Sequence, residues 1–241
     1  MSSPAGHQYD PYSAPMDMFV VDAQLQERLA FLRRVYTHVF GAILLLIGLE
    51  FLYFQTPIAT TILQTFGRMW FIALIGVIAA CWFAQKLACS GASAAAQYGG
   101  LGLYVFAESI FLVPAIGFAL FRDPNILGKA AFLTFAITGG LTLVVIVSRK
   151  DFSFLRNALY LGGIALFAIG IASFFFGGFS LGILFSALVV VLMCGYILYE
   201  TSLIMNHLPT TAHVAGALMI FGSMAELFRH LIYIMSFLND D

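Results

Sequence analysis

The chain has 241 residues, of which 61% are hydrophobic and only 10% are charged, and its mean hydropathy is +0.97. A soluble domain carries roughly a quarter charged residues, so this composition excludes an ordinary soluble protein and indicates an all-α, polytopic membrane protein embedded in a lipid bilayer. A net charge of −1, with no basic stripe, argues against a nucleic acid partner.

The N-terminal region is polar and contains no hydrophobic signal core, so no cleaved secretory signal is expected. Residues 1–25 predict a mobile tail, followed by a seven-helix transmembrane domain over residues 26–241. Helical spacing over residues 22–36 places Leu25, Leu29, Leu32 and Tyr36 on one face, which favours a short interfacial helix that runs into the first span.

Apolar stretches long enough to cross a bilayer recur along the rest of the chain. Seven transmembrane helices are predicted, over residues 37–54, 69–86, 98–121, 129–148, 157–177, 179–205 and 213–238. They form a bundle joined by short connectors.

The positive charges that flank these spans predict the orientation of the chain, because Lys and Arg concentrate on the cytoplasmic side. With the N-terminus in the cytoplasm, seven such residues fall inside and three outside, so the C-terminus is expected outside. The inner residues are Arg28, Arg33, Arg34, Lys86, Arg149, Lys150 and Arg156, and the outer ones are Arg68, Arg122 and Lys129.

Four carboxylic acids lie inside the predicted spans, where a charge is costly and usually marks a functional site: Glu50, Glu108, Glu200 and Glu226. At 1.5 Å per helical residue, Glu200, Glu108 and Ser223 lie about 9, 12 and 15 Å from the cytoplasmic end of their helices. These three residues are therefore expected to share a polar cluster. Neither Glu200 nor Glu108 has a basic residue three or four positions away, so both are candidates for proton-linked switching or transient cation coordination. This role is favoured for Glu200, whereas a purely structural role is an equal alternative for Glu108.

The last span carries a second group of charges. Arg229 and His230 follow Glu226 by three and four residues, so all three lie on one helical face and an ion pair between Glu226 and Arg229 is expected. Glu50 lies about 21 Å from the inner side, matching Arg229 in depth, and is a predicted second partner. The alternative is that these pairs only lock helices together.

The connector from Ser148 to Arg156 carries three basic residues, which indicates a cytoplasmic anchor at the lipid headgroups. Asp151 or Ser153 is expected to cap the next helix. The alternative is that the connector is a docking site for a cytosolic partner. The cysteines and histidines show no metal-ligand or catalytic spacing, and Ser202 near His207 is the one weak match to a Ser/His pair. No metal, no cofactor and no enzymatic activity are therefore expected.

Three motifs carry a resemblance to a known family: FLRRVY at 31–36, SRKDFSFL at 148–155 and ILYETSLI at 197–204. With them the chain resembles the Bax inhibitor-1 family of seven-helix membrane proteins, in particular its bacterial YccA-like branch, over most of its length after residue 25. The resemblance implies a multi-pass protein of the bacterial inner membrane.

Calcium-conducting members of this family carry a pair of acids, on the sixth and seventh helices, that share protons and gate a calcium leak. The resemblance places the first acid at Glu200 and the second at Ser223, so the pair is incomplete in this chain. Glu226, one turn further on, or Glu108 could substitute for it. A pH-sensitive calcium leak is thus one function that the resemblance implies.

The YccA-like branch implies a different function, that of a partner and modulator of the membrane AAA protease FtsH in membrane-protein quality control under stress. The protease would grip the cytosolic tail, which this chain has. This second function needs no catalytic residue, and we expected it ahead of the calcium leak.

Overall fold

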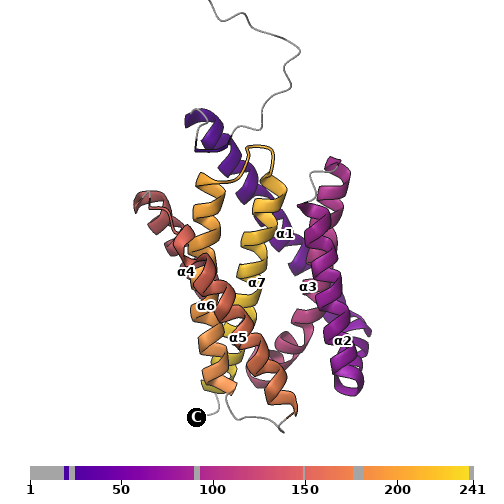
Figure 1. The fold of residues 1–241 in the computed structure, drawn as a ribbon. Helices are drawn as coiled ribbons and strands as arrows, with labels where there is room; N and C mark the ends of the chain where they lie inside the picture. The colour runs from indigo at the N-terminus through magenta and orange to yellow at the C-terminus, as the bar shows by residue number, and fades with distance from the viewer. Residues whose placement is uncertain (1–18, 22–24, 90–92, 149, 176–181, 239–241) are drawn as a thin grey trace, which may run out of the picture.

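The computed structural model describes residues 19–21, 25–89, 93–148, 150–175 and 182–238. The prediction of an all-α polytopic membrane protein is confirmed: the described residues form long helices that run side by side, with no sheet (Figure 1). In chain order the helices are α1 (Leu25–Gln55), α2 (Ile58–Ala88), α3 (Ala94–Arg122), α4 (Asn125–Ser148), a short 3-10 helix η1 (Ser153–Leu155), α5 (Arg156–Phe175), α6 (Gly182–Asn206) and α7 (His213–Leu238).

The second helix differs from its prediction over residues 69–86. It consists of two segments, Ile58–Met69 and Ile72–Ala88, that meet at an angle of 113°. Met69 leaves the helical conformation at the bend, with φ −135° and ψ 36°. Within the described residues, six helices are long and apolar enough to cross a membrane, and α2 makes a seventh span if the bent pair is counted as one. The predicted span corresponds to the second segment, and the first segment was not predicted.

Helix α7 lies at the centre of the bundle. Among the described elements it contacts α1, α2, α3, α4 and α6, whereas α5 contacts only α6 and η1. Small residues on α7, including Ala215, Gly216 and Ala217, are buried and allow these neighbours to approach closely. Glu226 and Arg229 of α7 therefore lie where several helices meet, so their charges are surrounded by protein and not by water.

Helices α2 and α3 pack backbone to backbone at the end of the bundle that was predicted to be cytoplasmic. A Cβ atom on Gly100 would lie 2.5 Å from the backbone nitrogen of Ala88 and 2.8 Å from the carbonyl oxygen of Ala84. Only glycine fits here, because any side chain would collide with the neighbouring backbone. This contact fixes one wall of the site described below.

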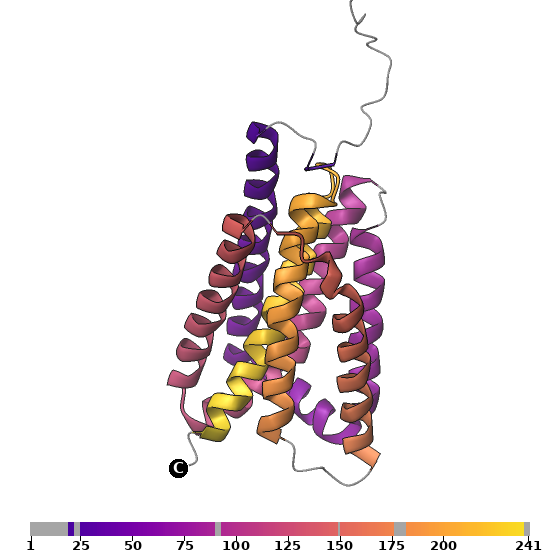
Figure 2. The ribbon, with the colours of Figure 1, turned by 60° about the vertical axis from the view of Figure 1, so that its left-hand side comes forward.

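The predicted helix that runs into the first span begins at Leu25 and continues to Gln55. Its buried residues include Phe31, Val35 and Val39, whereas Leu29, on the predicted face, is 58% exposed. The three residues are buried because one side of this stretch packs against α6 and α7. The start of α1 projects beyond the other helices at the top of Figure 2.

Residues 19–21 form a strap over the loop between α6 and α7. Phe19 forms an isolated antiparallel bridge with Pro209, and the Val20 N–H donates to the Leu208 carbonyl oxygen at 3.0 Å. Val20 is fully buried against Phe31 and its neighbours on α1, α6 and α7. The predicted mobile tail is thus wrong for residues 19–21; residues 1–18 and 22–24 lie outside the described residues.

Candidate functional site

Glu200 and Ser223 face each other across the α6–α7 contact. The Ser223 hydroxyl donates a hydrogen bond to Oε2 of Glu200 at 2.7 Å. The two helices are antiparallel and joined by a short loop, so residues at similar distances from that loop come together. Of the three residues predicted to form a polar cluster, the structure brings these two into direct contact.

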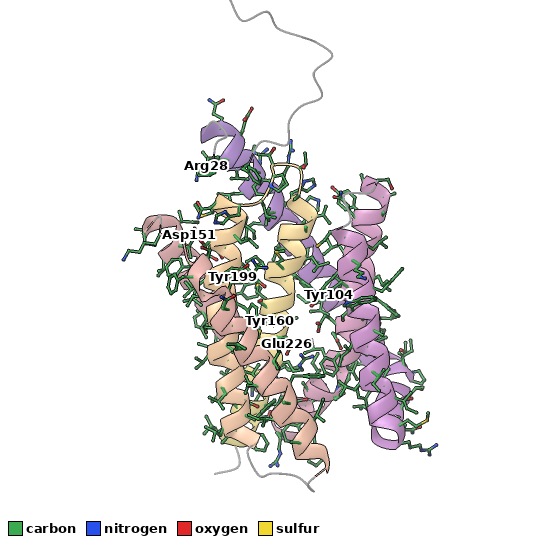
Figure 3. All side chains as sticks on the ribbon, viewed as in Figure 1. Arg28, Tyr104, Asp151, Tyr160, Tyr199 and Glu226 are labelled. Carbon is green, nitrogen blue, oxygen red and sulfur yellow. The ribbon has the colours of Figure 1, made fainter. Side chains whose placement is uncertain are left out.

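A pocket of about 290 Å³ lies beside this pair, with walls from four helices. Its lining residues are Gln85 and Cys89 from the end of α2, Tyr104 from α3, Met193, Tyr196 and Glu200 from α6, and Leu218, Met219, Gly222, Ser223 and Glu226 from α7. Figure 3 shows Tyr104 and Glu226 near the middle of the bundle, between the ribbons of α7 and α3. Glu226 thus lines the same pocket as Glu200, one helical turn deeper than Ser223.

Arg229 forms the centre of a buried charge network next to the pocket. Its side chain is 5% exposed, forms an ion pair with Glu226, and lies 3.7 Å from Oε2 of Glu108. Its guanidinium also stacks over the ring of Phe111, 3.9 Å from the ring centre. His230 adds a fourth polar group, with Nε2 3.7 Å from the Glu226 carboxylate. Glu108 is therefore a partner of Arg229 and does not join the Glu200–Ser223 pair as predicted.

Glu50 does not pair with Arg229, so that prediction is wrong. It is 8% exposed, and neither of its carboxylate oxygens has a hydrogen-bond partner in the part of the chain that the structure describes. Equal depth along two helices does not decide which faces meet. The side of Arg229 that Glu50 was expected to occupy is taken by α3, through Glu108 and Phe111.

Tyr104 and Gly222 are residues of the site that sequence reasoning missed. A Cβ atom at Gly222 would lie 2.6 Å from the Tyr104 hydroxyl, so the missing side chain makes room for the tyrosine. The Tyr104 ring also packs edge-on against Phe221. A glycine one residue before Ser223 was the available signal, but glycines are frequent in membrane helices, so it did not stand out.

A second polar group that the sequence did not reveal links α1, α3 and α7 near their predicted cytoplasmic ends. The Tyr98 hydroxyl lies 3.1 Å from Nε2 of His38 and 3.3 Å from Nε2 of His213. Nδ1 of His38 lies 2.6 Å from the Arg34 carbonyl oxygen. Because that carbonyl can only accept, Nδ1 carries the proton and Nε2 accepts from Tyr98. This chain of contacts ties the three helices together beside the strap.

The connector before α5 is held by Asp151. The Ser153 N–H and the Ser202 hydroxyl donate to its Oδ1 at 2.8 and 3.1 Å, and Nε2 of His207 lies 3.1 Å from its Oδ2. These contacts lower the pKa of the Asp151 carboxyl, chiefly through the Ser153 backbone N–H. Asp151 lies between Ser202 and His207, so the arrangement differs from a serine hydrolase triad, in which the histidine contacts the serine.

Among the described residues, no three His, Cys, Asp or Glu side chains converge in a way that could hold a metal ion. Cys81, Cys89 and Cys194 are free thiols. The chemistry that the arrangement offers is therefore that of carboxylates, hydroxyls and tyrosine rings in a membrane setting.

Comparison with known proteins gives a consistent result. The family model described as "Inhibitor of apoptosis-promoting Bax1" matches residues 28–240. Protein lifeguard 4 of Mus musculus is 27% identical over 229 residues, which cover 91% of this chain and 90% of that protein. An uncharacterized membrane protein of Vibrio cholerae is 28% identical over a match that covers 54% of this chain and 59% of that protein. Bax inhibitor 1 of Sus scrofa is 28% identical over a match that covers 60% of this chain and 62% of that protein.

Proposed function

Because this chain belongs to the Bax inhibitor-1 family of integral membrane proteins, we propose that it provides a passive, proton-sensitive pathway for cations across a bacterial inner membrane, with Glu200 as the main cation-binding group. One observation carries the proposal: Glu200, hydrogen-bonded to Ser223, lines a pocket whose walls also hold Glu226 and, among the described residues, no Lys, Arg or His. Such a pocket attracts cations and repels anions.

Proton sensitivity follows from the ligand type. A proton and a metal cation compete for the same carboxylate oxygens, so a cation binds Glu200 only when the side chain is ionised. The Ser223 hydroxyl donates to the Glu200 carboxylate and can turn its lone pairs toward a cation, since a hydroxyl both donates and accepts. Oxygen ligands of this kind suit calcium.

The replacement of the family's second acid by Ser223 bears on the strength of binding. Glu226 supplies a second carboxylate to the same pocket, but its charge is partly balanced by Arg229. Calcium prefers six to eight oxygen ligands, and this pocket offers few. We therefore propose weak, transient coordination, which is compatible with passage of the ion and incompatible with its storage.

The test is calcium flux into proteoliposomes that contain the purified protein, measured from pH 6 to pH 8. We expect flux to fall as the pH is lowered, because protons displace calcium from Glu200, and Glu200→Gln to abolish both the flux and its pH dependence. Glu50→Gln is the matched control, since Glu50 is a buried intramembrane acid that does not line the pocket. Flux that is unchanged in Glu200→Gln would contradict the proposal.

A second candidate function is modulation of an FtsH-type membrane protease. Its support is that 18 residues precede the strap, and the strap packs at the end of the bundle that the positive charges predict to be cytoplasmic. Deletion of residues 1–18 removes the segment that we propose the protease grips and keeps Phe19, Val20 and Val21 of the strap. This function predicts that the deletion abolishes co-purification with the protease and spares calcium flux, whereas Glu200→Gln does the reverse.

A further inference from the structure

The pocket beside Glu200 is open to the side of the bundle. Gln85 and Cys89 of α2 form one wall and Met193, Tyr196 and Glu200 of α6 form the opposite one. In the described chain neither α5 nor α6 contacts α2, and no residue of α5 lines the pocket. In Figure 1, α2 and α6 lie on opposite sides of α7. A molecule in the surrounding bilayer can therefore reach the pocket laterally.

The level of this opening in the membrane is indicated by α2. Trp82 lies one turn before Gln85 and is 58% exposed, and the ammonium group of Lys86 lies 3.8 Å from the centre of its ring. Exposed tryptophan and lysine side chains of this kind concentrate where the acyl chains meet the headgroups. The opening thus lies near the headgroups of one leaflet, where amphiphilic molecules place their polar ends.

The lining of the pocket combines the features that recognise an organic ammonium group. Glu200 and Glu226 are carboxylic acids, and Tyr104 and Tyr196 are aromatic residues of the type that attracts cations. Met193, Leu218 and Met219 provide apolar surface toward an attached hydrocarbon. None of the described lining residues is basic, so an anionic or zwitterionic phosphate head would find no partner there.

The size of the pocket also favours an organic ligand over a bare ion. A volume of about 290 Å³ corresponds to roughly ten water molecules at ~30 Å³ each. A single calcium ion would need several of those waters to complete its coordination shell. An amine head with the first carbons of its chain fills the same space and replaces those waters with direct contacts.

We infer that this pocket binds the ammonium head of a single-chain amphiphilic amine, which enters from the bilayer and leaves its alkyl chain in the lipid between α2 and α6. The inference rests on the proposed function in taking Glu200 as a cation-binding group. A bound amine occupies the oxygens that calcium would use, so it acts as a blocker of the pathway.

Cys89 provides a native reporter, because it is an exposed thiol that lines the pocket. In a Cys81→Ser, Cys194→Ser background, the full chain in lipid nanodiscs is alkylated with a maleimide, and the rate at Cys89 is followed by mass spectrometry. We expect dodecylammonium to slow alkylation several-fold and saturably. Dodecanol and dodecyl sulfate, which have the same chain, should leave the rate unchanged.

Two variants test the charge requirement. Glu200→Gln and Glu226→Gln should each raise the dodecylammonium concentration that protects Cys89, by about tenfold for the loss of one charge-assisted contact. Glu50→Gln should leave it unchanged. Equal protection by dodecanol, or undiminished protection in both pocket variants, would overturn the inference and indicate simple partitioning into lipid.

The outcome is separable from that of the proposed function. Glu200-dependent calcium flux without protection of Cys89 would reject the amine site and leave the cation pathway standing. Protection of Cys89 that depends on both acids, in a protein that conducts no calcium at any pH, would support the binding site and reject the pathway.

Discussion

Arg229 is the residue on which the buried charges of this bundle depend. It is the one cation within ion-pair distance of Glu226 and Glu108 in the described chain, and it is almost fully buried. Its planar guanidinium can interact with two carboxylates and stack on Phe111 at the same time, whereas the ammonium group of a lysine could not. Among the described residues, no cation forms an ion pair with Glu200, which accepts a hydrogen bond from Ser223 instead.

Replacement of Arg229 by Met is expected to destabilise the protein by roughly 3–5 kcal/mol, because it leaves buried carboxylates without a counter-charge. Thermal unfolding in detergent measures the effect. The triple variant Arg229→Met, Glu108→Gln, Glu226→Gln should regain most of the loss, since no uncompensated charge remains. A single variant as stable as the wild type would show that the network contributes nothing to folding.

Asp151 makes the connector before α5 sensitive to acid. The Ser153 N–H, with His207 and Ser202, lowers the pKa of its carboxyl below the ordinary value of about 4. A depressed pKa in the folded state means that the stabilisation is fully present above the ordinary pKa and is lost as the pH falls through the lowered one. At neutral pH the connector should therefore be held firmly.

Hydrogen exchange at the amides of Phe152 and Ser153 measures this, after correction for intrinsic rates. The Phe152 N–H donates to Ser202, so its protection should depend on the same contacts. We expect protection to decrease below about pH 4 in the wild type. In Asp151→Asn it should be low at all pH values, and a wild-type profile in this variant would contradict the assignment.

Helices α2 and α3 are held at a separation that depends on Gly100. The close approach puts Gln85 and Cys89 next to Tyr104, so the packing of two elements determines the width of the pocket. Nothing comparable surrounds Gly99, where an added Cβ would have no atom within 4 Å.

Gly100→Ala is expected to destabilise the protein by about 1–3 kcal/mol, because backbone atoms of α2 cannot move aside as a flexible side chain would. Gly99→Ala should be neutral or slightly stabilising, since alanine favours a helix by up to about 1 kcal/mol. Thermal unfolding of the two variants side by side measures the difference. Equal behaviour would show that α2 separates from α3 at no cost.

The element scale also shows where local patterns mislead. An apolar run predicted the second segment of α2 within a few residues, but hydropathy does not predict the 113° bend between the two segments. In the same way, the leucine face of α1 suggested an interfacial helix, while Phe31 and Val35 were buried by the strap and by α7. Periodicity predicts a helix, but the neighbours decide which face is covered.

At the scale of the whole molecule, the start of α1 and the end of α7 lie at opposite ends of the bundle (Figure 1). Seven crossings, with the bent α2 counted as one, produce this arrangement. Together with the distribution of Lys and Arg it predicts that the strap and the α6–α7 loop lie in the cytoplasm and that the C-terminus lies outside.

Alkaline phosphatase fusions test this topology, because the enzyme is active only after export. A fusion after residue 241 and a fusion at residue 124, in the α3–α4 loop, should both be active. A fusion at residue 210, in the α6–α7 loop, should be inactive. The opposite pattern would place Glu200 and the pocket near the outer leaflet and reverse the orientation.

The amino-acid sequence by itself determined that this protein is a bundle of membrane-spanning helices with a few acids in its interior, because apolar run length and the cost of a charge in lipid are local properties. It also placed Glu226 beside Arg229, since both lie on one helix. Only the tertiary structure decided that Arg229 pairs with Glu108 and not with Glu50, that Glu200 meets Ser223, and that Val20 packs against the α6–α7 loop. These contacts depend on how each helix is rotated about its axis and on which helices are neighbours. The depth of a residue along its own helix gives no information about either.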